Sequence, residues 1–539
     1  MSGDDSKFTF DSVNGPLTRR QVLGSAALGV GALAFAPVLS GCGGGGTSAS
    51  PSTVASTATG PKKGGSLRIG LVGGSSKDTL DGQAPVAEVE NCFTFQLYNA
   101  LLGWDKDYNP VNLLAEEVTP NAAADEWTIR IKPDIEFHNG KTLTSDDVVY
   151  SLQRILDPSS PKNGATGIGL SLKPAGIAKI DERTVRLSLY QPNAVFHEQL
   201  SNYANCILPV DFDPRTPVGT GPFKFKSHRP GEQAAFVANQ NYWGEGPYVD
   251  DLTILEFPEP STRVNALLGD TVDAISQLPR SQASTIASSG TAEVLQAQTG
   301  AWISFTMATD QKPLDDVRVR QAMRLIIDRP QMLEQAYSGS GRVGNDMYAP
   351  FDPGYPNDLP QRVQDLEQAK SLLKQAGQEG LSITLNTSES VGGGAVAAAQ
   401  VFAEQAKGAG VNVKVNKIDP SVYWGDNYLK YTFAQTFYYT HNYLYQTTLN
   451  TLPGSIWDEV HMNNPKWEAT VKEAFRTVDS QKRNELVAEA QTIEHNEGGH
   501  IIWAFNDQLD AYSKKLGGVL PYKDGIPLAG FRFNLFYFV

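Results

Sequence analysis

Residues 137–152, FHNGKTLTSDDVVYSL, carry the strongest indication of the fold in this chain. The strand-like alternation of residues 127–131 comes shortly before it, and His138-Asn139-Gly140 is typical of a turn. Thr144 is followed three residues later by Asp147, a capping box that predicts a helix through Leu156. The stretch thus predicts a strand, a turn and a capped helix in succession.

The same alternation continues on both sides of this stretch. Period-two patterns predict strands over residues 66–71, 184–190, 223–226, 252–257, 302–307, 381–386 and 411–418. Helices are expected over residues 263–268, 315–327, 363–375 and 395–407, with glycines after three of them. Strands that alternate with helices favour an α/β fold in which crossover helices join the strands of a sheet.

The expected helix over 315–327 has an apolar face of Val319, Ala322, Met323 and Ile326. Its arginines, Arg318, Arg320 and Arg324, lie off that face. We expect them on a solvated surface and do not interpret them as a phosphate site.

Six motifs occur in one order along the chain, and together they resemble the peptide/nickel-type solute-binding proteins of ABC importers, family 5. They are KGGSLRIG (63–70), NALL (99–102), the 137–152 stretch, VGTGPF (218–223), NYW (241–243) and DDVRVRQA (315–322). Each motif is weak alone, but six in register identify the family. The resemblance implies a two-lobe periplasmic-binding-protein-like fold, with an extra subdomain in the first lobe and a hinge cleft between the lobes.

In that fold the first lobe is expected over 63–104, 219–300 and 505–539, with the extra subdomain over 105–218. The second lobe is expected over 301–504. Two crossing segments, near Trp302 and near Phe505, would act as the hinge, and its closure would enclose a ligand.

The N-terminal segment predicts export. Arg19 and Arg20 precede an uncharged stretch from 22 to 39, which Leu39-Ser40-Gly41-Cys42 follows. Residues 1–41 thus resemble a twin-arginine lipoprotein signal peptide in which Cys42 receives the lipid. The alternative is a membrane-spanning helix, which the glycines and the proline of the stretch weaken. Residues 42–62, rich in Gly, Ser and Thr, are expected to be a flexible tether.

Composition limits the partners and the chemistry. Lysine and arginine number 45 against 59 acidic residues, a net charge of −14, which argues against nucleic acid as a partner. Cys42 would be lipidated, which leaves Cys92 and Cys206. These two either pair as a disulfide or stay as buried thiols. His495 and His500 are five residues apart and miss the spacing that puts two metal ligands on one helix face, so no metal site is expected.

The densest chemical feature is the segment from Tyr423 to Tyr445. It holds ten aromatic residues, whereas the chain average of 9% predicts about two. Tyrosine supplies flat apolar area and a hydroxyl group, which suit a pocket that closes over a small molecule. The alternative is packing, and we expect about half of the ten in the core. The candidates for the cleft include Tyr423, Trp424, Tyr438, Tyr439 and Tyr443.

Residues 439–443, YTHNY, have the spacing of the aromatic-x-x-Asp-Tyr segment of peptide-binding members. In that family the Asp holds the free α-amino group of the peptide, but Asn442 stands here, and Tyr439 replaces the usual Trp. An amide offers no counter-charge to an ammonium group, and charge-assisted hydrogen bonds are about twice as strong as neutral ones. Either another acid supplies the charge, or the ligand lacks a terminal amine and is an amino-acid conjugate, an opine or a polyol-like solute.

Four further residues are candidate ligand contacts. His441 either touches the ligand or is a packed neutral side chain, and Trp302 either stacks on the ligand or packs in the core. Arg342 and Asn345 lie in the glycine-rich segment 338–345, where an arginine can bind a carboxylate, although a solvated loop is the main alternative.

The sequence favours a binding protein over an enzyme. It contains no Gly-x-Ser-x-Gly elbow, no His-Glu-x-x-His and no phosphate loop. We expect a monomeric, lipid-anchored receptor, in the periplasm or at the outer face of the cytoplasmic membrane and without a cofactor, that hands a small solute to ABC permease subunits. The alternatives are a binding protein that signals or scaffolds without transport and a secreted hydrolase.

Overall fold

The computed structural model describes residues 61–539, except residues 74, 76, 161, 163 and 258. The signal peptide expected over 1–41, with Arg19 and Arg20, lies outside the described residues, as does Cys42. No helix in the described part of the chain combines the length and the apolar character needed to cross a membrane. Export and lipid anchoring therefore stay predictions.

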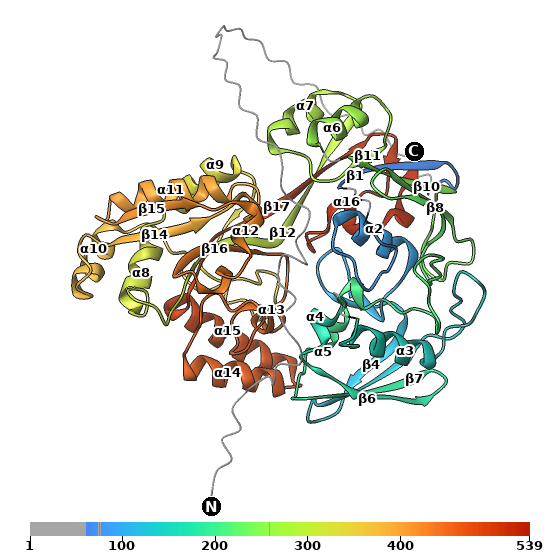
Figure 1. Ribbon diagram of the computed structural model, residues 1–539, viewed down its shortest axis with the longest axis horizontal. Coiled ribbons are helices and arrows are strands. Elements are labelled where there is room, and N and C mark those ends of the chain that lie inside the picture. The colour runs from blue at the N-terminus through green and yellow to red at the C-terminus, as the bar shows by residue number, and fades with distance from the viewer. Residues whose placement is uncertain (1–60, 74, 76, 161, 163, 258) are drawn as a thin grey trace, which may run out of the picture.

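The molecule has two lobes that share one long sheet (Figure 1). In the described residues this sheet has nine strands, in the order β16-β12-β17-β11-β1-β10-β9-β8, and β13 pairs with β17. β1 runs parallel to β10 and β11, and the other pairs are antiparallel. The strands are β1 (Ser66–Val72), β8 (Phe223–Arg229), β9 (Gln233–Ala238), β10 (Asp251–Phe257), β11 (Ala274–Ile275), β12 (Ala292–Met307), β13 (Arg342–Val343), β16 (Phe433–Tyr438) and β17 (His500–Ser513).

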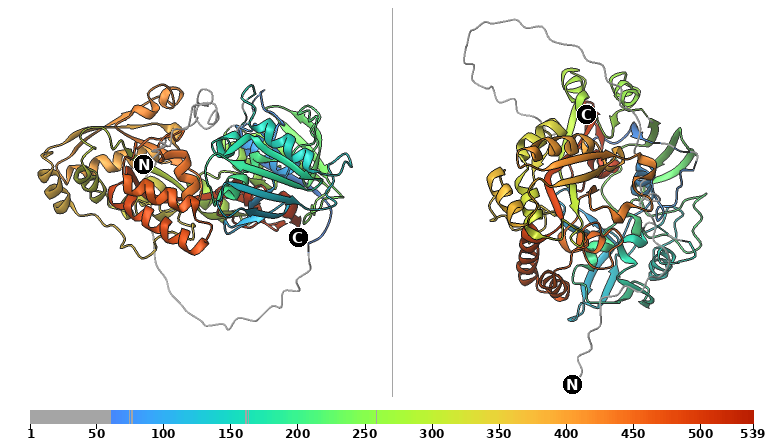
Figure 2. Two further views of the ribbon diagram at one scale, coloured as in Figure 1. Left: turned by 90° about the horizontal axis from the view of Figure 1, so that it is seen from below. Right: turned by 60° about the vertical axis from the view of Figure 1, so that its left-hand side comes forward.

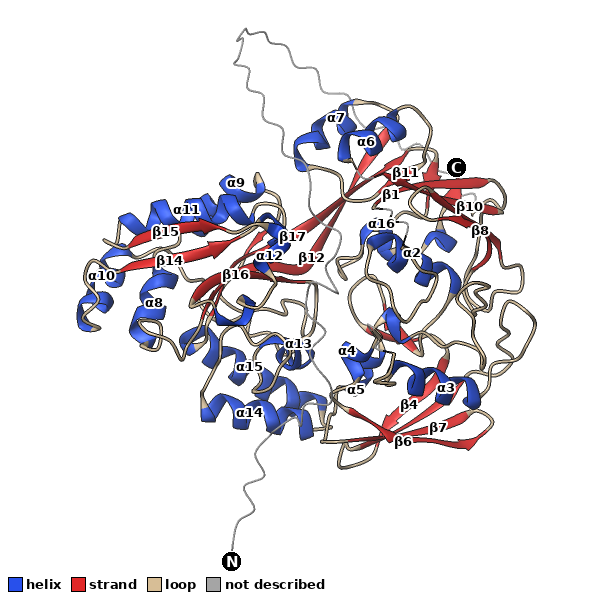
Figure 3. Ribbon diagram, viewed as in Figure 1, coloured by secondary structure: helices blue, strands red, loops and turns tan. Residues whose placement is uncertain are grey.

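β12 and β17 run from one lobe into the other (Figures 1 and 3). Ala292 pairs with Ser513 in the first lobe, and Thr306 pairs with His500 in the second. The register shifts on both sides of Trp302, which pairs with Phe505. Such irregularities bend a strand and increase its twist, so both strands change direction between the lobes.

The strand expected over 302–307 is the C-terminal part of β12, which has 16 residues. The longer N-terminal part, which starts at Ala292, was missed because it contains alanine and glutamate, which have low strand propensity.

The first lobe contains β1 and β8–β11, covered by α2 (Glu88–Leu97), α6 (Pro260–Leu268), α7 (Ala283–Ser288) and α16 (Pro527–Gly530). Its core includes Leu67 and Ile69 of β1 and Phe93 of α2, all buried. The chain ends there in a small pair of strands, β18 (Leu516–Gly517) and β19 (Tyr537–Phe538).

The extra subdomain of the first lobe is an antiparallel sheet in the order β4-β5-β7-β6. Its elements are β3 (Pro110–Asn112), β4 (Ala115–Pro120), β5 (Glu126–Ile131), β6 (Leu172–Asp181), β7 (Thr184–Leu189), α3 (Ser145–Ile155), α4 (Ala165–Ile168) and α5 (Phe196–Leu200). β2 (Leu102–Trp104), which comes just before the subdomain, pairs with β3. The 137–152 stretch forms the turn and the capped helix that its sequence predicts. Phe137 and Leu152 pack in the core, and Thr144 N donates to Asp147 Oδ2 at 3.1 Å.

The second lobe is α/β with an additional helical layer (Figures 1 and 2). β14 (Ser382–Thr387) and β15 (Asn412–Lys417) pair in parallel, as the alternation of strands and helices predicts. The helices are α8 (Val317–Leu325), α9 (Arg329–Tyr337), α10 (Leu366–Gln375), α11 (Ala395–Lys407), α12 (Pro420–Tyr423), α13 (Tyr443–Asn450), α14 (Pro465–Arg476) and α15 (Ser480–Glu497).

The apolar face expected for α8 is buried, but the expectation for its arginines is wrong at two positions. Arg318 is half-exposed, whereas Arg320 and Arg324 are buried. Arg324 Nη2 donates to the carbonyl oxygen of Gly498 at 2.5 Å and to that of His500 at 3.2 Å. The end of α15 covers a second face of α8, and no local pattern reveals such a contact.

Cys92 and Cys206 are both free thiols and fully buried in the first-lobe core. Burial raises the pKa of each thiol well above its ordinary value. Of the two alternatives for these cysteines, the structure has the unpaired one.

Candidate functional site

The segment 439–442 joins β16 to α13 and contacts both lobes. Thr440 Oγ1 accepts a hydrogen bond from Gly300 N at 2.8 Å and donates to the carbonyl oxygen of Lys523 at 2.7 Å. The backbone oxygen of Thr440 accepts from Tyr108 Oη of the extra subdomain at 2.6 Å. Three remote parts of the chain therefore meet at Thr440.

Asn442 forms a second contact between the lobes. It is the N-cap residue of α13 and is 5% exposed. Its Nδ2 donates to Oε1 of Glu198 in α5 at 3.0 Å, and Glu198 is 8% exposed. The next residue, Tyr443, donates its backbone N–H to Asp352 Oδ2 at 2.8 Å. Two carboxyl groups therefore lie at the start of α13, one from each lobe.

Burial controls the charge of these groups. Desolvation, followed by the nearby Asp352, raises the pKa of Glu198 to about 8, although the hydrogen bond from Asn442 and the charge of Arg483 oppose the rise. Desolvation also raises the pKa of Asp352. Because it disfavours the charged form, it lowers the pKa of His441 to about 4, so His441 is neutral near pH 7.

The other predicted residues of this segment differ in their surroundings. Tyr439 is 58% exposed, and Tyr438 is buried and donates to Glu459. The ring of His441 lies edge-on to Tyr445 at 4.9 Å between centroids. His441 lies in the loop before α13, and Tyr439 is the member of the segment with the most accessible ring.

Trp302 and Tyr443 lie in a packed aromatic cluster of the second lobe. Tyr348 stacks on both rings, with centroids 5.8 Å from Trp302 and 5.2 Å from Tyr443. Tyr443 Oη donates to Glu494 at 2.6 Å and accepts from Trp467 Nε1 at 2.8 Å. Trp302 is 1% exposed and Tyr443 is 0% exposed, so in this conformation both side chains pack in the core.

Tyr423 and Trp424 are also buried in the second lobe. Tyr423 Oη donates to the carbonyl oxygen of Gln435 at 2.7 Å, and the two rings meet edge-on at 4.7 Å. Their contacts position α12 against β16. A ligand role for these four buried aromatic residues stays a prediction.

Arg342 and Asn345 do not lie in a solvated loop, so that alternative is wrong. Arg342 belongs to β13, donates to the carbonyl oxygen of Thr299, and lies over the rings of Phe351 and Phe505. Asn345 is 7% exposed, and its Nδ2 donates to the carbonyl oxygen of Pro360 at 3.1 Å. Arg342 therefore links β12, β17 and the loop after β13, next to the bend between the lobes.

The two histidines considered for metal binding occupy different elements. His495 is in α15 and accepts from Arg362, whereas His500 starts β17 and contacts Ser304 and Asn450. In the described ranges, no group of three or more His, Cys, Asp or Glu residues is placed to hold a metal ion.

Sequence reasoning missed Glu198 and Asp352. Neither belongs to a recognisable motif, and Glu198 is separated from Asn442 by more than two hundred residues. The one indication in the sequence was that Asn442 stands where peptide-binding members have an Asp, so another acid could supply the charge.

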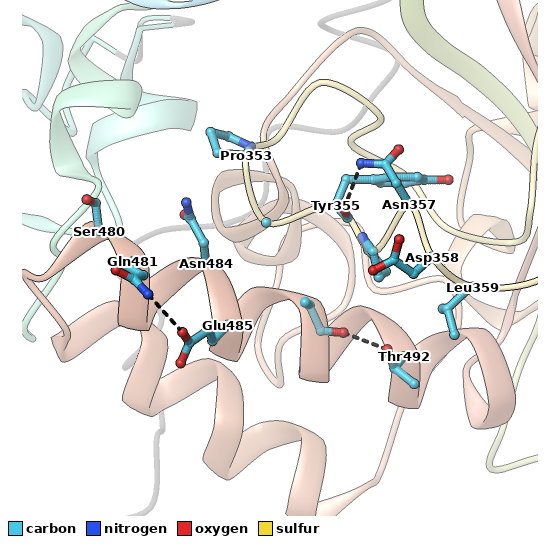
Figure 4. Close-up of a pocket in the computed structure, with 13 residues that line it drawn as sticks. Pro353, Tyr355, Asn357, Asp358, Leu359, Ser480, Gln481, Asn484, Glu485 and Thr492 are labelled. Carbon is cyan, nitrogen blue, oxygen red and sulfur yellow. Dashed lines mark hydrogen bonds between the residues drawn. The ribbon is translucent and has the colours of Figure 1, made fainter.

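A hollow of about 700 Å³ lies beside this contact, on the second lobe (Figure 4). It is bordered by residues 353–359, which directly follow Asp352, and by the first turns of α15. Tyr355, Asn357, Asn484 and Glu485 point toward it. It is open to solvent, and its lining mixes polar side chains with Pro353, Pro356, Leu359 and Ala488.

Comparisons with known proteins give concordant results. The chain is 26% identical over 468 residues to di/tripeptide-binding protein 2 of Pseudomonas aeruginosa, which covers 78% of this chain and 86% of that protein. It is 25% identical over 452 residues to the dipeptide-binding protein of Escherichia coli, covering 75% and 82%. The solved structure of the periplasmic binding protein AgaA of A. tumefaciens R10 with agropinic acid superposes with a TM-score of 0.72 at 23% identity, over 88% of this chain and 99% of that one.

The structural similarity agrees with the two-lobe α/β fold expected from the sequence motifs. The family model described as "Bacterial extracellular solute-binding proteins, family 5 Middle" matches residues 109–452, well over half of the chain. The relatives are binding proteins and not enzymes. This chain belongs to the bacterial extracellular solute-binding proteins, family 5.

Proposed function

We propose that this chain captures a peptide or an amino-acid-derived, opine-like solute between its lobes and delivers it, as a monomer, to an ABC import permease. Proteins of the family are extracytoplasmic and work with ABC permeases. The observation that carries the proposal is the contact at Thr440 and Asn442, where one short segment of the second lobe meets the first lobe. A solute held there touches both lobes, so its binding favours the closed state.

The names of relatives support both solute classes. Two relatives are named for dipeptides or tripeptides, and one structural neighbour was solved with agropinic acid. The ligand contacts that we propose are Tyr438, Tyr439, His441, Asn442, Tyr443, Trp302, Tyr423, Trp424, Arg342 and Asn345. The buried members of this set would act by shaping the wall behind Tyr439 and Asn442, because they have little accessible surface.

The boundaries of the lobes are part of the proposal. We assign residues 63–104, 219–300 and 505–539 to the first lobe, 105–218 to its extra subdomain and 301–504 to the second lobe. The pairing of Trp302 with Phe505 supports a hinge at both crossings, because the register of β12 and β17 shifts there.

Anchoring is the third part of the proposal. Export would follow from Arg19 and Arg20, and a lipid on Cys42 would hold the receptor at the outer face of the membrane. A short flexible tether over 42–62 raises the effective concentration of the receptor near its permease.

Two binding assays and one uptake assay test this function. Native mass spectrometry of the full chain, purified without denaturation, should find a solute that co-purifies, and calorimetry with dipeptides and opines should give micromolar or tighter binding. Uptake of that solute should fall in a strain that lacks the chain. Binding with unchanged uptake would refute import and favour a signalling role, and the absence of any bound solute in both binding assays would refute solute capture.

A further inference from the structure

Three arginines of the second lobe surround one buried carboxyl group, that of Asp346. Arg329 Nη2 donates to Asp346 Oδ2 at 2.6 Å, and Arg362 Nη1 donates to the same oxygen. Arg324 is the third arginine whose charge acts on Asp346. The arginine cluster, as we name it, consists of Arg324, Arg329, Asp346, Arg362 and His495.

The arginine cluster is enclosed within the second lobe. Arg324 is 0% exposed, Arg329 is 1% exposed and Asp346 is 2% exposed. Arg362 lies at the edge, with 13% of its side chain exposed. Three positive charges thus share one negative charge away from water, and a buried charge without a counter-charge is costly in free energy.

The charges that act most strongly on Arg324 are mainly positive. They are those of Asp346 and of three further arginines. Desolvation, reinforced by the arginines and opposed by Asp346, lowers the pKa of Arg324 to about 9, so the group is still charged near pH 7. Glu494 does not balance this charge, because burial raises its pKa to about 7 and its oxygens already accept from two tyrosine hydroxyl groups.

Several N–H groups of the arginine cluster have no acceptor among the described residues. They are Arg324 Nε and Nη1, Arg329 Nε and His495 Nε2, and all are buried. His495 Nδ1 accepts from Arg362 at 3.1 Å, so the neutral ring carries its proton on Nε2. Asp346 Oδ1 is the acceptor of the cluster that lacks a donor in the described part of the chain. One oxygen cannot serve donors on three side chains, although buried polar groups are normally paired.

We propose that the arginine cluster holds a small inorganic anion, a halide such as chloride, which accepts from Arg324 Nε and Nη1. The ion supplies both the negative charge and the acceptor that the cluster lacks. Arg324 has no exposed surface, so the ion enters during folding or a local opening, and a carboxylate-bearing solute is too large to follow it. This site is independent of the proposed function.

The anion stabilises the second lobe at the point where β17 leaves it. Arg324 Nη2 donates to the carbonyl oxygen of His500, the first residue of β17. Arg329 is the first residue of α9, and Arg362 Nη2 donates to the carbonyl oxygen of His495 in α15 at 2.9 Å. An ion held by these side chains therefore joins α8, α9 and the end of α15 to the start of the strand that crosses the hinge.

Thermal unfolding of the full chain in sodium chloride, sodium bromide and sodium gluconate at equal ionic strength tests the site. Above the dissociation constant, each tenfold rise in halide should raise the melting temperature by about 2 °C more than the same rise in gluconate. Arg324→Lys keeps a donor for the carbonyl oxygens but loses the guanidinium N–H groups, so it should lose the halide dependence. Arg318→Lys, on the half-exposed side of the same helix, should keep it.

Crystals of the protein grown in bromide give a second readout. We expect an anomalous peak within hydrogen-bond distance of Arg324 Nη1. Equal melting temperatures of the wild type in halide and gluconate would overturn the site, and a peak without a thermal effect would show binding at crystal concentration only and also overturn it. An ordered water without anomalous signal at these nitrogens, or a peak elsewhere, would refute the assignment to the arginine cluster. If Arg324→Lys fails to fold, the wild-type response and the position of the peak decide.

Discussion

Glu198 makes the contact between the lobes sensitive to pH. Burial raises the pKa of this carboxyl from 4.5 to about 8 in this structure, where Glu198 and Asn442 join the two lobes. Lobe separation removes Asn442 and Asp352 and returns the carboxyl to water, where the pKa is ordinary. The groups that face Glu198 are Asn442, Asp352, Arg483, Tyr108 and Tyr445.

A raised carboxyl pKa has a definite consequence for closure. The contact has its full stability below pH 4.5, where Glu198 is protonated in both forms, and loses stability as the pH rises toward 8. The difference of about 3.5 pKa units corresponds to a loss of about 5 kcal/mol in all. About 4 kcal/mol of it falls between pH 5 and pH 9, which is roughly a thousand-fold change in the ratio of open to closed molecules.

Small-angle X-ray scattering of the ligand-free full chain from pH 5 to pH 9 measures this ratio. We expect the radius of gyration to increase with pH in the wild-type protein. Glu198→Gln should remain closed throughout, because glutamine keeps an acceptor for Asn442 Nδ2 and carries no charge. Glu232→Gln serves as the matched control and should behave like the wild type. Identical pH profiles for the wild type and Glu198→Gln would show that Glu198 does not control the contact between the lobes.

Three further predictions concern the fold. Gly219→Ala should lower stability by about 1–3 kcal/mol in thermal unfolding, because a Cβ there collides with a backbone carbonyl oxygen of α2; an unchanged melting temperature would contradict this packing. Arg324→Ala should cost about 3–5 kcal/mol, because it leaves buried carbonyl oxygens without their donor, and the half-exposed Arg318→Ala should cost less than about 1 kcal/mol; equal losses would refute the difference in burial. Cys92 and Cys206 should be inert to a thiol reagent in the native chain and both react after unfolding without reductant, whereas two unreactive sulfurs would indicate a disulfide.

Local sequence determined much of the secondary structure. The capping box at Thr144 places the start of α3, and the apolar spacing of residues 395–407 matches α11 from end to end. Both features depend on interactions within a few residues of chain. The two-lobe arrangement was predicted from the resemblance to the family, which rests on six motifs in one order along the chain.

Contacts between residues far apart in the chain could not be predicted from the sequence. Arg324 is predicted to be a surface residue, yet the end of α15 covers it. β12 extends from Ala292 to Met307, well beyond the predicted strand over 302–307, because pairing with β17 extends a segment of weak strand propensity.

For the candidate site, local sequence shows that segment 439–442 is unusual and that Asn442 carries no charge where peptide-binding members have an Asp. The acid that lies opposite Asn442 becomes visible once the lobes are packed together. Glu198 is brought to Asn442 by the packing of α5 between two cores, an arrangement that depends on Val195, Phe196 and Leu200 burying their side chains in different directions. A local sequence pattern cannot identify a hydrogen-bond partner that lies in the other lobe, because that pairing results from how the two lobes pack together.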